Sequence, residues 1–333
     1  MIGERGGVLT RPTEIDGADA DVPIRPVTRL TPGDRAFRTM ATVATSFSLL
    51  IVTVTFVFLV NESRPALEAS GVWSFFTTSV WNPTVGKFGV LGLLEGTLII
   101  SGIAMVVGVP LALAMALFIN EYAPSRLRGP LTSVIDLLAA LPSLLFGMWG
   151  FFALQHQLVP VAKFLTGHFS VFPFFQLTSS NATLAQSSFV AGVVVGVMIL
   201  PIVTSVSRDV MAQVPREQCE GALALGGTRW GMIREVILPF GRNGILGASL
   251  LGFGRALGET IAVALIISPV FDANTHILER GAGSIAALIA VRFGEAGQLE
   301  RSGLIAAGLA LFLLTLVVSL VARRIVARSA AVR

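Results

Sequence analysis

Long apolar segments recur along this 333-residue chain and constrain its fold more than any other feature. A helix that crosses the hydrocarbon core of a bilayer needs about 20 mostly apolar residues. Segments of that kind lie at approximately 41–60, 91–118, 131–154, 189–206, 244–267 and 304–325. Because a bilayer offers the backbone no hydrogen-bonding partner, such spans must be helical. The sequence therefore predicts an all-α integral membrane protein with six transmembrane helices.

Composition excludes several other classes of protein. Only 13% of the residues are charged and 53% are hydrophobic, whereas about a quarter are charged in soluble domains. The high isoelectric point, about 10.2, does not indicate a nucleic-acid partner, because the arginines lie at the ends of the apolar segments and leave no solvated basic face. A single cysteine, Cys219, and scattered histidines predict neither a disulfide framework nor a metal site. We interpret Cys219 as a small packing residue.

The N-terminal 36 residues differ from the rest of the chain. They are polar, rich in Asp, Pro and Gly, and lack the apolar core of a signal peptide. We expect residues 1–36 to be a disordered cytosolic tail, followed by a membrane domain over residues 37–328.

The distribution of basic residues predicts the orientation, because cytosolic segments carry the excess of Lys and Arg. With the N-terminus inside, the outer segments hold only Arg64, Lys87, Lys163, Arg280, Arg292 and Arg301, and Arg255 lies within a span. The remaining basic residues are then all cytosolic. Both termini and the loop over residues 211–242 are therefore predicted to face the cytosol. Aromatic residues in the outer segments 61–88 and 164–175 are typical of interfacial anchors, and contact with an external partner stays open as the alternative.

The loop over residues 211–242 is longer and more patterned than a simple turn requires. It contains Glu220–Pro239, which reads EGALALGGTRWGMIREVILP. We expect a short helix with a small-residue face at Ala222, Leu225 and Gly226, which Gly226-Gly227 ends or bends. A second short amphipathic helix would end at Pro239. Two such helices across the membrane surface would form a shallow docking knob for a cytosolic partner.

The same spacing resembles the EAA loop of ABC importer permeases. The matching positions are Glu220, Gly221, Ala222, Gly226, Val236, Leu238 and Pro239, with Gly221 and Val236 as mild departures. The resemblance implies a cytosolic coupling helix that docks onto a separate ATPase subunit. ATP and Mg²⁺ would then be bound by that partner, because this chain has no phosphate-binding loop of the G-x-x-x-x-G-K-[ST] type. The chain is therefore expected to be a transport subunit without a cofactor of its own, and not an enzyme.

A narrower resemblance covers roughly residues 75–325. The run Arg255-Ala256-Leu257-Gly258-Glu259-Thr260 is similar to the RAxGET signature of phosphate-specific ABC permeases. Further matches are Trp81-Asn82-Pro83, Gly96-Thr97 with Ser101, Glu121-Tyr122-Ala123-Pro124, the stretch 136–143 and the stretch 284–290. The long loop between the third and fourth spans looks more like the C subunit than its A-type paralogue.

This resemblance implies a type I ABC importer permease fold in the plasma (inner) membrane and inorganic phosphate as the substrate. It also implies a paralogous A-type permease subunit, two cytosolic ATPase subunits and an extracytoplasmic phosphate-binding protein as partners. A permease for another oxyanion and an ion-coupled secondary transporter are the alternatives. An additional role in reporting phosphate status through protein contacts also stays open.

Arg255 and Glu259 are charged residues within an apolar span. If the span begins near residue 243, Arg255 lies about 18 Å inside it. A charge at that depth costs ~3 kcal/mol or more, so it should face protein or water. Four residues apart on a helix, the two side chains would share a face. A guanidinium binds phosphate oxygens bidentately, but a purely structural Arg–Glu pair fits equally well on physical grounds. The resemblance favours a substrate pathway formed by Arg255, Glu259 and Thr260.

Asp136 and Pro142 lie in the third predicted span. Asp136, near its inner end, is interpreted first as a charge at a helix N-terminus, and a gating role stays open because the stretch matches the family. Pro142 is expected to kink the span beside the pathway.

Overall fold

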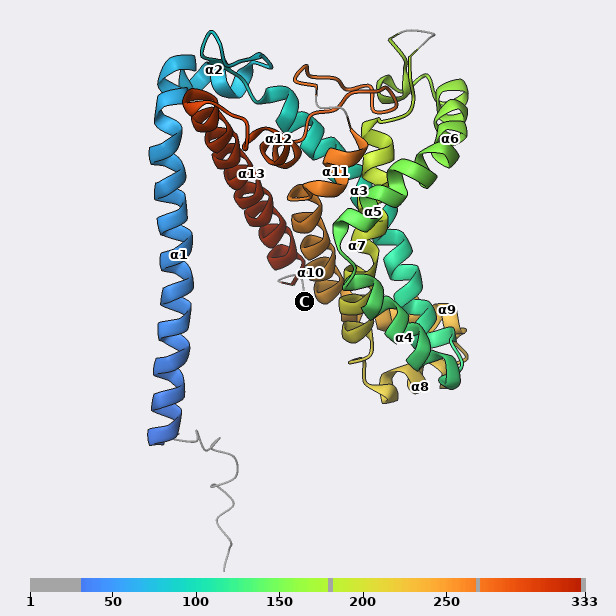
Figure 1. Ribbon diagram of the computed structural model, residues 1–333. Coiled ribbons are helices and arrows are strands. Elements are labelled where there is room, and N and C mark those ends of the chain that lie inside the picture. The colour runs from blue at the N-terminus through green and yellow to red at the C-terminus, as the bar shows by residue number, and fades with distance from the viewer. Residues whose placement is uncertain (1–30, 179–181, 268–269, 331–333) are drawn as a thin grey trace, which may run out of the picture. The chain divides into compact units, whose positions relative to one another are not determined.

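In the part of the chain that the structure describes, the protein is mostly helical (Figure 1). The computed structural model describes residues 31–178, 182–267 and 270–330. The chain forms two compact units, Met1–Val54 and Thr55–Arg333. The α-helices are α1 (Pro32–Ser70), α2 (Val72–Thr77), α3 (Leu91–Leu117), α4 (Ser125–Ala139), α5 (Ser143–Trp149), α6 (Gln155–His168), α7 (Ser188–Met211), α8 (Arg216–Ala224), α9 (Arg229–Met232), α10 (Leu238–Leu257), α11 (Ile261–Ile266), α12 (Ile285–Arg292) and α13 (Gln298–Ala330).

Shorter elements join some of these helices. Strands β1 (Trp81–Asn82) and β2 (Lys87–Phe88) form an antiparallel hairpin in which Trp81 pairs with Phe88. A 3-10 turn lies at Pro173–Phe175. Turns of π-helix follow α3 at Phe118–Tyr122, follow α5 at Gly150–Leu154 and precede α10 at Ile233–Ile237.

The first unit, in its described part, consists of the beginning of α1. Thr31 caps this helix: its hydroxyl oxygen accepts from the backbone N–H of Asp34 at 3.2 Å, and the Asp34 carboxylate accepts from the Thr31 N–H at 3.0 Å. Residues 31–54 all expose their side chains, and most of those beyond Thr39 are apolar. An apolar helix surface of this kind is suited to lipid or to a partner helix. The predicted tail 1–36 lies mostly outside the described residues, and residues 32–36 are already helical.

The prediction of an all-α membrane fold with six transmembrane helices is confirmed. Within the described ranges, six helices are long and apolar enough to cross a membrane. They are Pro32–Ser70, Leu91–Tyr122, Ser143–His168, Ser188–Met211, Arg229–Leu257 and Gln298–Arg324.

The third span differs from the predicted segment 131–154. The chain leaves the helix at residues 140–142, so that α4 ends at Ala139 and α5 begins at Ser143. Pro142, with φ −60° and ψ 138°, occupies the N-cap position of α5 and does not kink a continuous helix. The physical reason is the steric restriction that a proline imposes on the residue before it, which disfavours helical backbone. The third candidate span continues instead to His168.

The fifth span is also shifted from its predicted position at 244–267. Helix α10 ends at Leu257, and residues 258–260 separate it from the short helix α11. At the other end, the helical path begins already at Arg229, with α9 and the π-helical turn Ile233–Ile237 leading into α10.

Helices α3 and α7 form the centre of the second unit. Gly108 of α3 faces Gly196 of α7 so closely that a Cβ atom on Gly108 would lie 2.7 Å from the Gly196 carbonyl oxygen. Small residues allow two membrane helices to approach and gain van der Waals contact. Around this seam, Ile100, Val194 and Ile199 are buried. The close packing makes α3 and α7 the rigid frame against which α10 and α4 lie.

The end of α1 that belongs to the second unit is fixed by a side chain inserted into its backbone. The Ser302 hydroxyl accepts from the N–H of Ala66 at 3.2 Å and donates to the carbonyl of Glu62 at 2.7 Å. These two backbone groups would bond each other in an uninterrupted α-helix. Pro65 lies between them and disturbs the local ladder, so the serine hydroxyl satisfies both groups.

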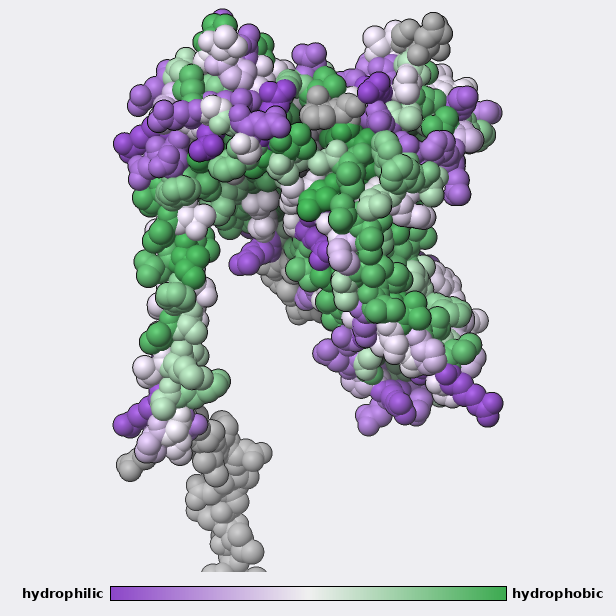
Figure 2. Space-filling model, viewed as in Figure 1, coloured by the Kyte–Doolittle hydropathy of each residue, from purple (hydrophilic) through white to green (hydrophobic). Residues whose placement is uncertain are grey.

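The two ends of the second unit are polar and its middle is apolar. Figure 2 shows the helices α3, α5 and α7 as an apolar band between hydrophilic ends. In Figure 1, α2 and α12 lie at one end, and α4, α8 and α9 lie at the opposite end. An apolar band bounded in this way is what a bilayer requires.

Two loops at the end of the second unit that carries α2 and α12 are joined by hydrogen bonds. The Glu279 carboxylate accepts from the backbone and from the hydroxyl of Thr178, and the Ile277 N–H donates to the Phe174 carbonyl at 3.1 Å. The ring of Trp81 stacks on Phe271 with centroids 5.6 Å apart. This surface is therefore ordered by specific contacts.

Candidate functional site

The segment between α7 and α10 forms an exposed helix–turn–helix. It consists of α8, a turn over residues 225–228, α9 and the π-helical turn Ile233–Ile237 (Figure 1). We call residues 211–242 the coupling segment. The coupling segment lies at the same end of the second unit as α4. Within the described ranges, no other long polar connection at this end carries two helices.

The turn after α8 is a Schellman motif, as the glycines predict. Gly226 has φ +85°, in the left-handed region. The Gly227 N–H donates to the carbonyl of Ala222 at 3.1 Å, and the Gly226 N–H donates to the carbonyl of Leu223 at 3.0 Å. These bonds satisfy carbonyls that the end of a helix leaves without a donor. The next helix is capped by the Thr228 hydroxyl, which accepts from the Gly231 N–H at 3.1 Å.

Gly226→Ala is expected to destabilise the coupling segment by about 1–2 kcal/mol, because left-handed backbone is sterically unfavourable for alanine. Gly221→Ala is the matched control: a Cβ on Gly221 has no neighbour within 4 Å, and this glycine lies in ordinary helical backbone. The rate of hydrogen exchange at the amides of residues 216–230 in the purified protein measures the difference. Faster exchange in the Gly221→Ala protein than in the Gly226→Ala protein would contradict the assignment.

The residues of the predicted EAA pattern point in different directions. Ala222 packs inward, together with Val236 and Leu238, against a buried cluster that includes Met232 and Ile233. Glu220 and Gly221 are exposed instead. The expected small-residue face does not form a single outward surface. Ala222 faces inward and belongs to the packing that holds α8 in place.

Three large apolar side chains are exposed on the coupling segment, among its charged residues. Leu225 is 92% exposed, Trp230 is 59% exposed and Leu223 is 41% exposed. Large apolar groups outside the membrane are expensive to leave in water, and a cluster of them marks a contact surface. The sequence pattern did not single out Leu223 and Trp230, and placed Leu225 with the small residues.

Pro239 does not end the second helix of the segment, contrary to the prediction. It lies in the first turn of α10, and the helical path continues through it to Leu257. The π-helical turn Ile233–Ile237 directly precedes it and widens the helix where the proline ring would meet the preceding turn.

Polar contacts fasten the coupling segment and α7 to the end of α3. The Arg229 guanidinium donates to the carbonyl of Glu121 at 3.4 Å, and the Asn120 amide donates to the carbonyl of Arg208 at 2.9 Å. The sequence did not predict these two hydrogen bonds. The run 121–124, which matches the phosphate-specific permeases, was the signal that could have indicated a structural role for this turn. A displacement of the coupling segment would therefore be transmitted to α3 and α7.

Cys219 lies on the inward side of α8. Burial raises the pKa of the Cys219 thiol, and the charges of Glu121 and Glu220 raise this pKa further. The thiol is therefore protonated at neutral pH and poorly nucleophilic. Its contact with the buried cluster favours the interpretation as a packing residue.

The second feature is the interruption of the fifth span. Helix α10 ends at Leu257, and Thr260 is the N-cap residue of α11. The Thr260 hydroxyl donates to the carbonyl of Gly258 at 2.9 Å, which satisfies part of the freed backbone. Interrupted helices occur at membrane depth where the backbone lines a cavity or is buried in protein. The helix ends that meet here carry opposite partial charges.

The predicted pair Arg255 and Glu259 is divided by this interruption. Arg255 lies in the last turn of α10 and is exposed, whereas Glu259 is only 8% exposed. A Glu259 carboxylate oxygen accepts from the Ala262 N–H at 3.1 Å and so caps α11. Among the described residues, neither a hydrogen bond nor an ion pair involves the Arg255 side chain. The two charges therefore do not share a helical face, and each complements the helix end on which it lies.

Asp136 and Pro142 are not part of one membrane span. Asp136 is exposed on α4, and one of its carboxylate oxygens accepts a 3.4 Å hydrogen bond from Ser205 of α7. Pro142 is exposed at the start of α5. The two residues flank the turn between α4 and α5, and neither forms a hydrogen bond or ion pair with Arg255. A role in gating stays a prediction.

The arrangement of these helices is that of known importer permeases. A bacterial alginate ABC transporter, solved in complex with an alginate-bound periplasmic protein, matches 88% of this chain and 96% of its own, with a TM-score of 0.55 at 17% identity. A second structure of a bacterial alginate importer matches 88% and 99%, with a TM-score of 0.52. Six apolar helices with an exposed helix–turn–helix that leads into the fifth thus define the type I ABC importer permease fold.

Sequence comparison defines the family. Residues 108–330 match the model of the binding-protein-dependent transport system inner membrane component. The phosphate transport system permease protein PstC 2 of Mycobacterium bovis is 41% identical over 91% of this chain and 94% of its own. The PstC of Xylella fastidiosa is 37% identical over 89% and 91%, and that of Mycobacterium leprae is 42% identical over 81% and 85%.

The chain therefore belongs to the inner membrane components of binding-protein-dependent transport systems and, among them, to the PstC permeases. It is a transport component rather than an enzyme.

Proposed function

We propose that this chain is the permease subunit of an ATP-driven importer and that its substrate is inorganic phosphate. The names of its relatives support the substrate. The observation that carries the proposal on this chain's own residues is Arg255, which is exposed at the interruption of the fifth span and has no partner among the described residues. A guanidinium at a break in a membrane helix is suited to an anion, because it offers two parallel donors to phosphate oxygens.

The proposal assigns ATP binding, the second half of the pathway and substrate delivery to separate partner subunits. Two cytosolic ATPase subunits bind ATP and Mg²⁺, and one of them contacts the coupling segment of this chain. A paralogous A-type permease subunit forms the other half of the pathway, and an extracytoplasmic phosphate-binding protein delivers the substrate. Both termini lie in the cytosol, in agreement with the bias of Lys and Arg in the sequence.

Transport follows from the way the coupling segment is fixed. Closure of the ATPase dimer moves α8 and α9, and the contacts of Arg229 and Asn120 pass this motion to α3 and α7. Because α3 and α7 pack tightly at Gly108, they move as a rigid body. The pathway then alternates between openings on the two sides of the membrane.

Arg255 binds the anion transiently as it moves along the pathway. Its charge lowers the electrostatic cost of moving phosphate through a medium of low dielectric constant. Glu259 does not neutralise Arg255, because its carboxylate caps α11. The buried negative charge of Glu259, four residues further along the chain, opposes lasting retention of a dianion. Weak binding on the path permits release.

The test is uptake of labelled phosphate into vesicles that contain the complete complex. We expect uptake to require ATP, to survive an ionophore and to remain unchanged by excess sulfate. Uptake that collapses with the ionophore would identify an ion-coupled transporter. An assembled complex that hydrolyses ATP and moves sulfate but not phosphate would identify a permease for another oxyanion.

A further inference from the structure

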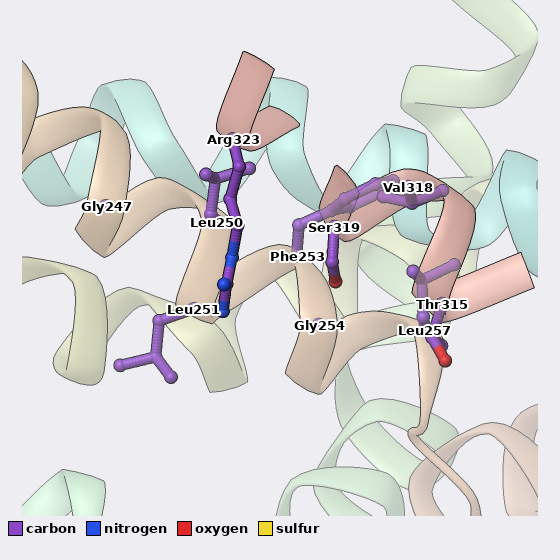
Figure 3. A pocket seen from close by; sticks show the side chains of 10 residues that line it. All are labelled: Gly247, Leu250, Leu251, Phe253, Gly254, Leu257, Thr315, Val318, Ser319 and Arg323. Atoms are coloured by element: carbon purple, nitrogen blue, oxygen red, sulfur yellow. The ribbon is translucent and has the colours of Figure 1, made fainter. Parts of the chain in front are cut away.

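A groove between α10 and α13 is not used by the proposed transport mechanism. It has a volume of about 530 Å³ and lies within the second unit. Figure 3 shows its lining side chains, with Arg323 beside Leu250 at one end and Thr315 beside Leu257 at the other. Thr315 and Arg323 are eight residues apart on one helix, so the groove is about 12 Å long.

The walls of the groove are apolar and its single charged group lies at one end. Leu250, Leu251, Phe253 and Leu257 of α10 line one side, with Val318 of α13 opposite. The Thr315 hydroxyl, at the other end, donates to the carbonyl of Phe312 and is thereby satisfied. Arg323 makes neither an ion pair nor a hydrogen bond with another described residue, and its side chain reaches across this end of the groove toward Leu251 (Figure 3).

This pattern matches the two parts of a phospholipid. An apolar trough fits an acyl chain, and a guanidinium at the end of the trough fits the phosphate of an anionic headgroup. Arg323 lies near the end of the last candidate span, at the level where headgroups begin, and basic pockets between membrane helices on the cytosolic side bind anionic headgroups. An arginine in this position also keeps its charge at the interface while its stem lies on apolar surface.

The size of the groove favours a lipid over a protein helix. A volume of about 530 Å³ lies in the range of small-ligand sites. A helix is about 10 Å wide with its side chains, so a partner helix would insert only single side chains into a trough of this volume. Such a helix would also place apolar residues against Arg323, whose charge has no partner among the described residues.

We infer that the groove between α10 and α13 binds one anionic phospholipid of the cytosolic leaflet, with an acyl chain along Leu250–Leu257 and its phosphate on Arg323. The lipid covers the exposed side of α10 up to Gly254, next to the interruption of the span. The inference does not depend on the identity of the transported anion.

The experiment uses the purified complete complex, stripped of lipid and titrated with dioleoyl phosphatidylglycerol or dioleoyl phosphatidylcholine. These lipids share their acyl chains and differ in headgroup charge. Native mass spectrometry counts the bound lipid. We expect the wild-type complex to retain phosphatidylglycerol in preference to phosphatidylcholine. Arg323→Gln should weaken phosphatidylglycerol binding by about tenfold and remove the preference.

Two further variants separate the parts of the site. Arg324→Gln makes the same charge change at an exposed residue outside the groove and should retain the preference. Gly254→Leu fills the groove, since a Cβ at Gly254 has no neighbour within 4 Å, and should reduce retention of both lipids. Unchanged lipid retention in Arg323→Gln would overturn the inference. Loss of the second permease subunit from the Gly254→Leu complex would overturn it as well, because the groove would then be a subunit interface.

Discussion

Replacing Arg255 with glutamine is expected to reduce ATP-driven phosphate uptake at least about a hundredfold, with the complex still assembled. Two charge-assisted hydrogen bonds contribute about 3–6 kcal/mol in total, and about 1.4 kcal/mol corresponds to a factor of ten. The variant keeps a polar side chain of similar length and removes the charge. Because no described residue pairs with Arg255, the change leaves no partner unsatisfied in the second unit. Initial uptake rates in vesicles measure the effect.

A matched control lies outside both the coupling segment and the fifth span. Arg64 is exposed on α1 and, among the described residues, its side chain forms no hydrogen bond or ion pair, so Arg64→Gln should transport normally. Arg255→Lys should recover part of the activity, because an ammonium supplies the charge without the planar pair of donors. Wild-type uptake by the Arg255→Gln complex would assign Arg255 a structural role. A complex that fails to assemble would be recognised by loss of the ATPase on purification.

Hydropathy predicted the transmembrane architecture because the bilayer imposes a length and a composition on each span. The segment 189–206 illustrates this success, since it lies within the continuous helix α7. The interruptions of helices were harder to predict. Gly258 by itself does not distinguish a flexible helical position from a helix end, and the deciding contact is the carboxylate of Glu259 on the N–H of Ala262. That contact exists only once α11 is in place.

The same limit applies to the third span and to the end of α1. Pro142 was recognised as a disturbance, but a kinked helix and a broken one are indistinguishable in sequence. At Pro65, the hydroxyl of Ser302 satisfies the disturbed backbone, although the two residues are 237 positions apart in the chain. Hydropathy and local spacing carry no information about such a distant donor.

For the candidate site, the sequence pattern located the coupling segment but did not resolve its faces. The glycines specify the turn, because only a residue that accepts left-handed backbone fits at Gly226. Whether Ala222 faces outward depends on the buried cluster around Met232 and Ile233, which belongs to the next turn of the segment. Likewise, the spacing of Arg255 and Glu259 implied a shared face only on the assumption of an unbroken helix.

Glu220→Arg is expected to weaken association with the ATPase at least about thirtyfold while leaving insertion into the membrane intact. Glu220 is exposed on α8 and, among the described residues, forms no ion pair or side-chain hydrogen bond. The substitution therefore spares the packing around Ala222 and reverses a charge beside the exposed Leu223 and Leu225. Reversal of a charge within a docked surface costs about 2–5 kcal/mol, and 2 kcal/mol corresponds to about thirtyfold in the dissociation constant.

The measurement is the dissociation constant between the purified permease pair and the ATPase subunit. Glu235→Arg provides the control, because Glu235 is also exposed in the coupling segment but lies on the π-helical turn outside α8. Its contact with Arg234, at 3.6 Å, is a surface ion pair of little energetic weight. If the surface of α8 is the docking site, Glu235→Arg binds the ATPase normally and Glu220→Arg does not. Equal weakening by both variants would indicate a general electrostatic effect, and undiminished binding by Glu220→Arg would place the docking surface elsewhere.

Because Leu225 is almost fully exposed, the same assay with Leu225→Ser would then locate the apolar part of the contact.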